Sequence, residues 1–132
     1  MGLDNGVNIV RNDYTNRIRA LKRFEASYDT EHKYNFSVCY WRKCWGLRGD
    51  ILGLIGKGSS DEWEYPLTKY DIEKIIDLLK SYDSKSWTDS IWDWDDKEYP
   101  YSKKIKQDIK DLKTLKRLMK KYDLEVYFYD SY

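Results

Sequence analysis

Several residue types are scarce in this chain of 132 residues, which contains two cysteines, two prolines, two alanines and one histidine. The cysteines, Cys39 and Cys44, are five residues apart, which on a helix separates their side chains by about 140°, so we expect no disulfide. With His32 as the single histidine, they are too few for a metal site, and we predict neither metal nor cofactor. Two free thiols are typical of a reducing cytoplasm.

Long apolar runs are also lacking. The longest stretch without a charged side chain, residues 34–41, has eight residues, whereas a membrane helix needs roughly 20 apolar residues. The first residues lack the basic and apolar regions of a secretory signal. We therefore expect no membrane contact and a cytoplasmic location.

Aromatic side chains, in contrast, are abundant. Six tryptophans, thirteen tyrosines and three phenylalanines make up 17% of the chain, which excludes a disordered or low-complexity protein. Leu, Ile, Val and Phe together supply only 29 residues, so tyrosine and tryptophan must build much of the core. The length suits one domain over residues 1–132.

The net charge of +1 hides a strong asymmetry along the chain. Residues 1–62 carry 10 bases and 8 acids (+2), residues 63–102 carry 5 and 10 (−5), and residues 103–132 carry 9 and 5 (+4). The chain is therefore not a bulk polycation of the kind that coats nucleic acid. Any site for nucleic acid or for an acidic protein has to be local.

Apolar periodicity and turn chemistry predict four strands and three helices. The strands are expected at 7–10, 63–67, 90–94 and 124–129, and the helices at 37–55, 69–82 and 101–121. The first helix rests on Trp41, Cys44, Trp45, Arg48, Ile51, Leu52 and Ile55, which recur every three or four residues. The second begins at a Thr68–Asp71 capping box. Residues 17–24 fit either a strand or a short helix.

The predicted order is β-α-β-α-β-α-β. Alternation alone suggests a parallel sheet, but the strands are short and half polar, unlike the aliphatic strands of buried parallel sheets. We therefore predict a single α+β domain, with about four short strands in one sheet and three helices on one main face.

Four short motifs occur in the same order as in a family of small uncharacterised phage and prophage proteins. They are Met1-Gly2-Leu3-Asp4, Tyr40-Trp41-Arg42-Lys43 at a helix start, a strand and capped helix resembling Glu64 to Leu79, and the aromatic ending Phe128-Tyr129-Asp130-Ser131-Tyr132. The chain resembles this family over most of its length except residues 11–36. The resemblance implies a phage origin and the cytoplasm of a bacterial host, and it carries no known activity.

The first candidate site is a polar cluster of Asp4, Arg42 and Asp130, which stand at predicted strand ends and at a predicted helix start. An arginine there can hold a carboxylate in a bidentate pair, which would form a small polar pocket. The alternative is a structural ion pair that fixes the chain termini.

The second candidate is an aromatic-acidic segment, whose predicted partner-binding residues are Trp87, Asp89, Trp92, Asp93, Trp94, Asp95, Asp96 and Glu98. Residues 83–98 carry six acids and two bases. Carboxylates around large aromatics suit a partner with a basic groove and resemble nucleic-acid phosphates. The alternative is that the tryptophans face the core while the acids are solvated.

The third candidate is the basic face of the helix at 101–121. Its predicted nucleic-acid-binding residues are Lys103, Lys106, Lys110, Lys113, Arg117 and Lys120, with Lys104, Lys116 and Lys121 alongside. Clustered cations contact phosphates, and the dominance of lysine over base-reading side chains predicts non-specific binding. The alternative is a solvated face, or one docked on the acidic segment.

No catalytic set is visible. His32 stands alone, and Gly53 to Gly58 lacks the residue order of a phosphate-binding loop. We therefore predict a non-enzymatic phage accessory protein that binds and inhibits a host defence or nucleic-acid-processing protein, as anti-CRISPR proteins do. The alternative is a small protein that binds nucleic acid or a nucleotide signal through the basic helix.

Overall fold

A computed structural model of the chain describes residues 4–25, 35–42, 45–56, 64–82 and 101–131. Its elements, in chain order, are β1 (Asp4–Val10), α1 (Asp13–Asn16), the 3-10 helix η1 (Arg19–Phe24), β2 (Asn35–Arg42), α2 (Trp45–Leu54), β3 (Glu64–Pro66), α3 (Lys69–Ser81), α5 (Tyr101–Lys121) and β4 (Val126–Ser131). The predicted α+β class is confirmed.

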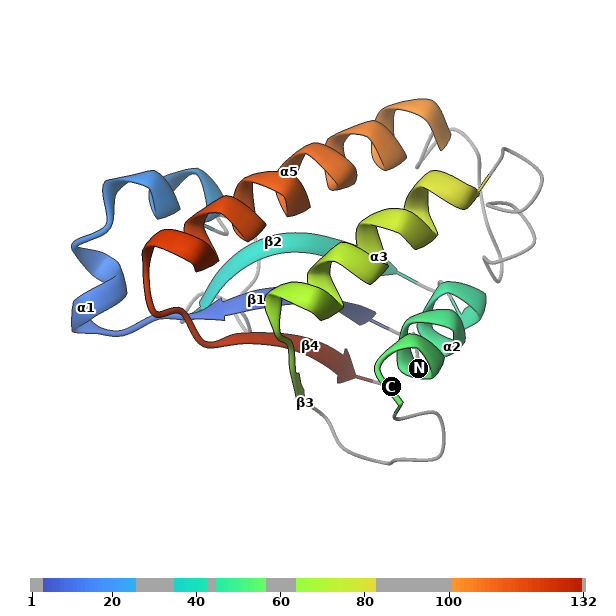
Figure 1. Cartoon of the computed structure of the whole chain (residues 1–132), viewed down its shortest axis with the longest axis horizontal. Coiled ribbons are helices and arrows are strands. Elements are labelled where there is room, and N and C mark those ends of the chain that lie inside the picture. The colour runs from blue at the N-terminus through green and yellow to red at the C-terminus, as the bar shows by residue number, and fades with distance from the viewer. Residues whose placement is uncertain (1–3, 26–34, 43–44, 57–63, 83–100, 132) are drawn as a thin grey trace.

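The described strands form one antiparallel sheet in the order β2-β1-β4-β3 (Figure 1). The N-terminal strand β1 is central: Val7 pairs with Cys39 of β2 on one side and with Phe128 of β4 on the other. Short β3 adds to β4 at the edge, where its Tyr65 pairs with Phe128. The first and last strands of the chain thus lie side by side in the middle of the sheet.

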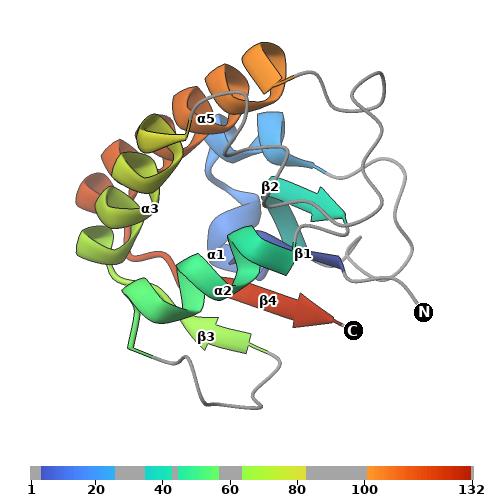
Figure 2. The same cartoon turned by 90° about the vertical axis from the view of Figure 1, so that its right-hand side faces the viewer.

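One face of the sheet is covered by helices (Figure 2). The residues that point to this face are aromatic as often as aliphatic. Five of them have no exposed surface: Val7, Ile9, Trp41, Tyr65 and Phe128. Trp41 and Tyr65 are the two largest fully buried side chains, so tryptophan and tyrosine contribute to the core, but most of the described core residues are Val, Ile and Leu.

Helix α3 agrees closely with its prediction. The Thr68 hydroxyl accepts from the backbone N–H of Asp71, and the Asp71 carboxylate accepts from the backbone N–H of Thr68, as a capping box requires. Its buried stripe is Ile72, Ile75, Ile76 and Leu79. Helix α5 runs antiparallel beside α3 across the sheet (Figure 1) and buries Ile105, Leu112 and Leu115.

The prediction of one helix over 37–55 is wrong in its first part, because residues 35–42 form β2 and the helix begins at Trp45. The predicted stripe begins at Trp41, which belongs to β2 but stands in helical spacing with residues of α2, so the predicted helix extends back into the strand. Strand β2 also contains a β-bulge: Cys39 pairs with Val7 whereas Ser37 pairs with Asn8, so Val38 is an extra residue. Its core-facing residues are Phe36, Cys39 and Trp41.

Two other predictions concern residues 17–24 and residues 90–94. Residues 17–24 contain η1, so the short-helix interpretation is the right one. The predicted strand at 90–94 lies outside the described residues, and the fourth strand of the sheet is β2. Among the described helices, none is long and apolar enough to cross a membrane.

Cys39 is a buried free thiol on β2, not on a helix, and Cys44 lies outside the described residues. The argument from helical geometry against a disulfide between the two therefore does not apply.

Candidate functional site

The sheet brings the backbones of the predicted polar cluster together. Asp4 of β1 pairs with Arg42 of β2 on one side and with Ser131 of β4 on the other, next to Asp130. The side chains of Asp4 and Arg42 lie outside the described part of the structure. The three positions thus share one end of the sheet, as their places at strand ends suggested.

Asp130 is fully buried and is held by Arg48 of α2. The Arg48 Nε donates to both carboxylate oxygens of Asp130 at 2.8 Å, and the Arg48 Nη2 lies 2.8 Å from Oδ2. This charge-assisted, multiply bonded pair fixes the end of β4 against α2. Sequence reasoning missed Arg48 as the partner because it counted this residue only as part of an apolar helix face.

A second buried polar group lies beneath the start of α5. Asp108 is 2% exposed, and its carboxylate accepts from Trp41 Nε1 at 2.9 Å and from Lys104 Nζ at 2.8 Å. Burial raises the pKa of Asp108, and the Lys104 ammonium opposes that rise. The same burial, with the Asp108 carboxylate nearby, raises the pKa of the Cys39 thiol well above its ordinary value. Cys39 is therefore a structural thiol and not a nucleophile.

Between these two groups, Asn5 completes a polar row across the sheet. It pairs with Trp41 of β2 and with Asp130 of β4, and its side chain is fully buried. Its amide oxygen and nitrogen have no hydrogen-bond partner among the described residues. The row joins α5 and α2 to the sheet, which gives it a role in positioning both helices.

The predicted partner-binding residues Trp87, Asp89, Trp92, Asp93, Trp94, Asp95, Asp96 and Glu98 all lie outside the described residues. Whether the three tryptophans are core residues or partner anchors stays a prediction.

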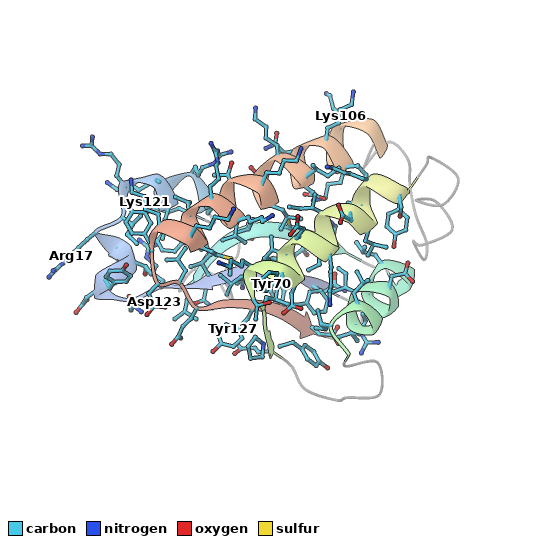
Figure 3. The ribbon with its side chains drawn as sticks, viewed as in Figure 1. Arg17, Tyr70, Lys106, Lys121, Asp123 and Tyr127 are labelled. Carbon is cyan, nitrogen blue, oxygen red and sulfur yellow. The ribbon has the colours of Figure 1, made fainter. Side chains whose placement is uncertain are left out.

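The predicted basic face, in contrast, is fully described. At 3.6 residues per turn, eight cations of α5 lie on an arc of about 140° that points away from the core. They are Lys103, Lys106, Lys110, Lys113, Lys116, Arg117, Lys120 and Lys121, of which all but the half-buried Lys116 are exposed. In Figure 3, Lys106 projects from α5 on the side away from the sheet.

No carboxylate of α5 lies on this basic face. The helix has two acids, Asp108 and Asp111. Asp108 is buried under Trp41, and Asp111 accepts from Arg23 Nη2 of η1 at 2.9 Å and from Gln107 Nε2 at 3.0 Å. Both acids are thus engaged beside or beneath the helix, and neither neutralises the outer cations.

The cations line a groove of about 590 Å³ over α5, between η1 and α3. Seven bases and two acids line it, a difference of +5. The lining residues are Arg23, Glu73, Ile76, Asp77, Lys80, Lys110, Lys113, Thr114, Lys116, Arg117 and Lys120. Four of the six predicted nucleic-acid-binding residues, Lys110, Lys113, Arg117 and Lys120, are among them; Lys103 and Lys106 continue the same helix face.

Two ion pairs hold the walls of the groove to α5. Arg23 of η1 bonds to Asp111 on one side, and Lys116 Nζ lies 3.1 Å from Glu73 Oε1 of α3 on the other. Exposed pairs of this kind add little stability, but they connect η1 and α3 to α5 on the two sides of the groove. Sequence reasoning missed Arg23 and Lys80, because residues on η1 and α3 join the groove only through the tertiary fold.

Within the described ranges, no group of three or more His, Cys, Asp or Glu side chains is placed to hold a metal ion. No protein-family model, curated protein or solved structure matches this chain. The resemblance to phage proteins therefore stays a prediction, and the function has to be argued from the site.

Proposed function

We propose that this protein is a non-enzymatic nucleic-acid-binding protein that holds phosphates on the outer face of α5. The observation that carries the proposal is the set of eight cations on that face without a carboxylate among them. Clustered lysine and arginine side chains are what phosphate backbones require, and they release the counterions that phosphates hold.

A solvent-exposed helix face that binds no ligand normally carries both positive and negative side chains. Here like charges follow each other at spacings of three and four, as at Lys106, Lys110 and Lys113. Each such pair destabilises a helix by a few tenths of a kcal/mol. Lys116 pairs with Glu73, and Lys120 and Lys121 stand in the last turn, where they favour the helix dipole, but the cations nearer the middle of the face have no such role in the fold. A polyanionic ligand accounts for the pattern.

The groove fits a phosphate chain better than a single nucleotide signal. No aromatic ring of the described residues lines it, so the groove offers a base no ring on which to stack. A phosphate chain, in contrast, needs only the cations. Capture of a host protein through residues 87–98 remains a separate proposal that the described residues do not address.

The test compares two charge-matched variants. Replacing Lys106, Lys110, Lys113 and Lys120 with glutamine removes four positive charges from the basic face without touching the core. We expect the affinity for a labelled 20-base-pair duplex, measured by fluorescence anisotropy in 50 mM salt, to fall by about 100-fold or more, because each lost phosphate contact costs counterion release.

The control variant carries glutamine at Arg17, Arg19, Lys69 and Lys74, four exposed cations that do not line the groove. It has the same net charge, and its affinity is expected to stay within about threefold of the unchanged protein, since distant charges are screened. Equal losses in the two variants would reject the basic face as the binding site, and no binding by the unchanged protein would reject the function itself.

A further inference from the structure

The charge geometry of α5 also points to the form of the nucleic acid. We infer that the ligand is a double helix, gripped along its phosphates, and that a carboxylate on α3 limits how tightly it binds. This inference rests on the proposed function, and it names the ligand class of the same groove.

The cations at the centre of the basic face form one straight row. Lys106, Lys110, Lys113, Arg117 and Lys120 follow each other at steps of four, three, four and three residues. On an α-helix these steps advance about 5 Å each, so the row is about 21 Å long. Because α5 is packed on the sheet and on α3, the backbone positions that carry the row are fixed relative to one another.

A row of cations with fixed backbone spacing favours a partner whose phosphates are already in order. Duplex nucleic acid is stiff over about 150 base pairs, so its phosphates are already ordered when they meet the row. A single strand has to be straightened first, at a cost in conformational entropy. Proteins that bind single strands offset this cost by stacking bases on aromatic side chains, at about 1–3 kcal/mol per base.

The basic face lacks such stacking groups. The two large hydrophobic side chains that are exposed in the described part of the chain are Tyr14 and Tyr70, and neither lines the groove. The row consists of four lysines and one arginine, and Arg117 donates to Thr114 at 3.3 Å. Contacts to phosphates carry no sequence information, so we expect the binding to be independent of sequence.

The α3 wall adds an opposing charge. Glu73 is engaged by Lys116, but Asp77 is exposed, lines the groove and has no ion-pair partner among the described residues. A phosphate chain in the groove is repelled by Asp77 and therefore lies toward Lys110 and Arg117. Removing this one negative charge is expected to strengthen binding.

The experiment measures the unchanged protein against four probes of equal length or charge in 50 mM salt: duplex DNA, duplex RNA, single-stranded DNA and poly-glutamate. We expect the duplexes to bind at least tenfold more tightly than the single strand, and poly-glutamate to compete poorly at equal charge. The two duplex arms separate DNA from RNA as the source of the phosphates, and tight binding of either supports the inference.

A single strand bound as tightly as the duplexes would overturn the inference while leaving the proposed function intact. Effective competition by poly-glutamate would assign the face to an acidic protein and overturn both. As a further check, Asp77→Asn is expected to raise duplex affinity about two- to fivefold. Glu64→Gln, an exposed acid on β3 at the opposite edge of the fold, is the matched control and is expected to change nothing (Figure 1). No gain from Asp77→Asn would remove that residue from the account.

Discussion

Replacing Gly6 with alanine is expected to destabilise the fold by about 4 kcal/mol or more, the level reached only when a core position is severely disturbed. Gly6 lies in the central strand β1, between Tyr40 of β2 and Tyr129 of β4. A Cβ atom there would overlap the backbone carbonyl oxygen of Cys39 and would stand 2.9 Å from Tyr129 Cε1. Backbone cannot move aside as a flexible side chain can, so β1 and β2 would have to separate.

Urea denaturation followed by circular dichroism measures this loss. Gly49→Ala is the matched control, because Gly49 is exposed on α2 and a Cβ there meets nothing within 4 Å. Alanine in a helix interior is favoured over glycine by up to about 1 kcal/mol, so the control is expected to be stabilised. A Gly6→Ala protein as stable as the unchanged chain would show that the strand register around Gly6 is wrong.

Replacing Asp130 with alanine is expected to lower the free energy of unfolding by about 3–5 kcal/mol, the usual cost of removing one partner of a buried ion pair. The Arg48 side chain is only 20% exposed, so its guanidinium loses three short contacts to Asp130 without regaining full hydration. Arg48→Met is expected to cost at least as much, because it leaves the fully buried Asp130 carboxylate without its cation.

A double-mutant cycle separates the pair from its surroundings. Asp130→Ala combined with Arg48→Met removes both charges, so its loss is expected to be clearly smaller than the sum of the two single losses. Strictly additive losses in urea denaturation would mean that Arg48 and Asp130 do not act as a pair. The result matters for the sheet, since this pair ties the C-terminal strand to α2.

Local signals allowed the capped helix α3 and the apolar stripe of α5 to be predicted, because a capping box and a regular 3.6-residue period depend only on neighbouring residues. The strand β2 was mispredicted because Trp41 stands in helical spacing with the apolar residues of α2 that follow it. What makes residues 35–42 a strand is their pairing with β1, and a single sequence does not show which segments pair.

Some residues of the candidate site could likewise be predicted from the sequence, and others could not. The basic face could be predicted because all of its cations belong to one helix. The groove could not, since Arg23 and Lys80 reach it from η1 and α3, and their approach depends on how three elements pack. Likewise, the sequence placed Asp130 at a polar end of the sheet, but its partner Arg48 is 82 residues away and only the fold brings the two together.

Asp108 connects the core of the protein to the basic face of α5. It lies on the inner side of α5 and bonds to Trp41 of the sheet, while the cations of the same helix point outward. The sheet thereby fixes not only the position of α5 but also its rotation, and the rotation decides which side chains face a ligand.

The salt dependence of duplex binding tests the central claim most directly. If five cations of the α5 row each neutralise a phosphate, the logarithm of the association constant should fall against the logarithm of salt concentration with a slope of about −4.5. Affinity would then drop about 500-fold between 50 and 200 mM salt. A slope shallower than about −1, or affinity that does not change over this range, would contradict phosphate binding by the basic face of α5.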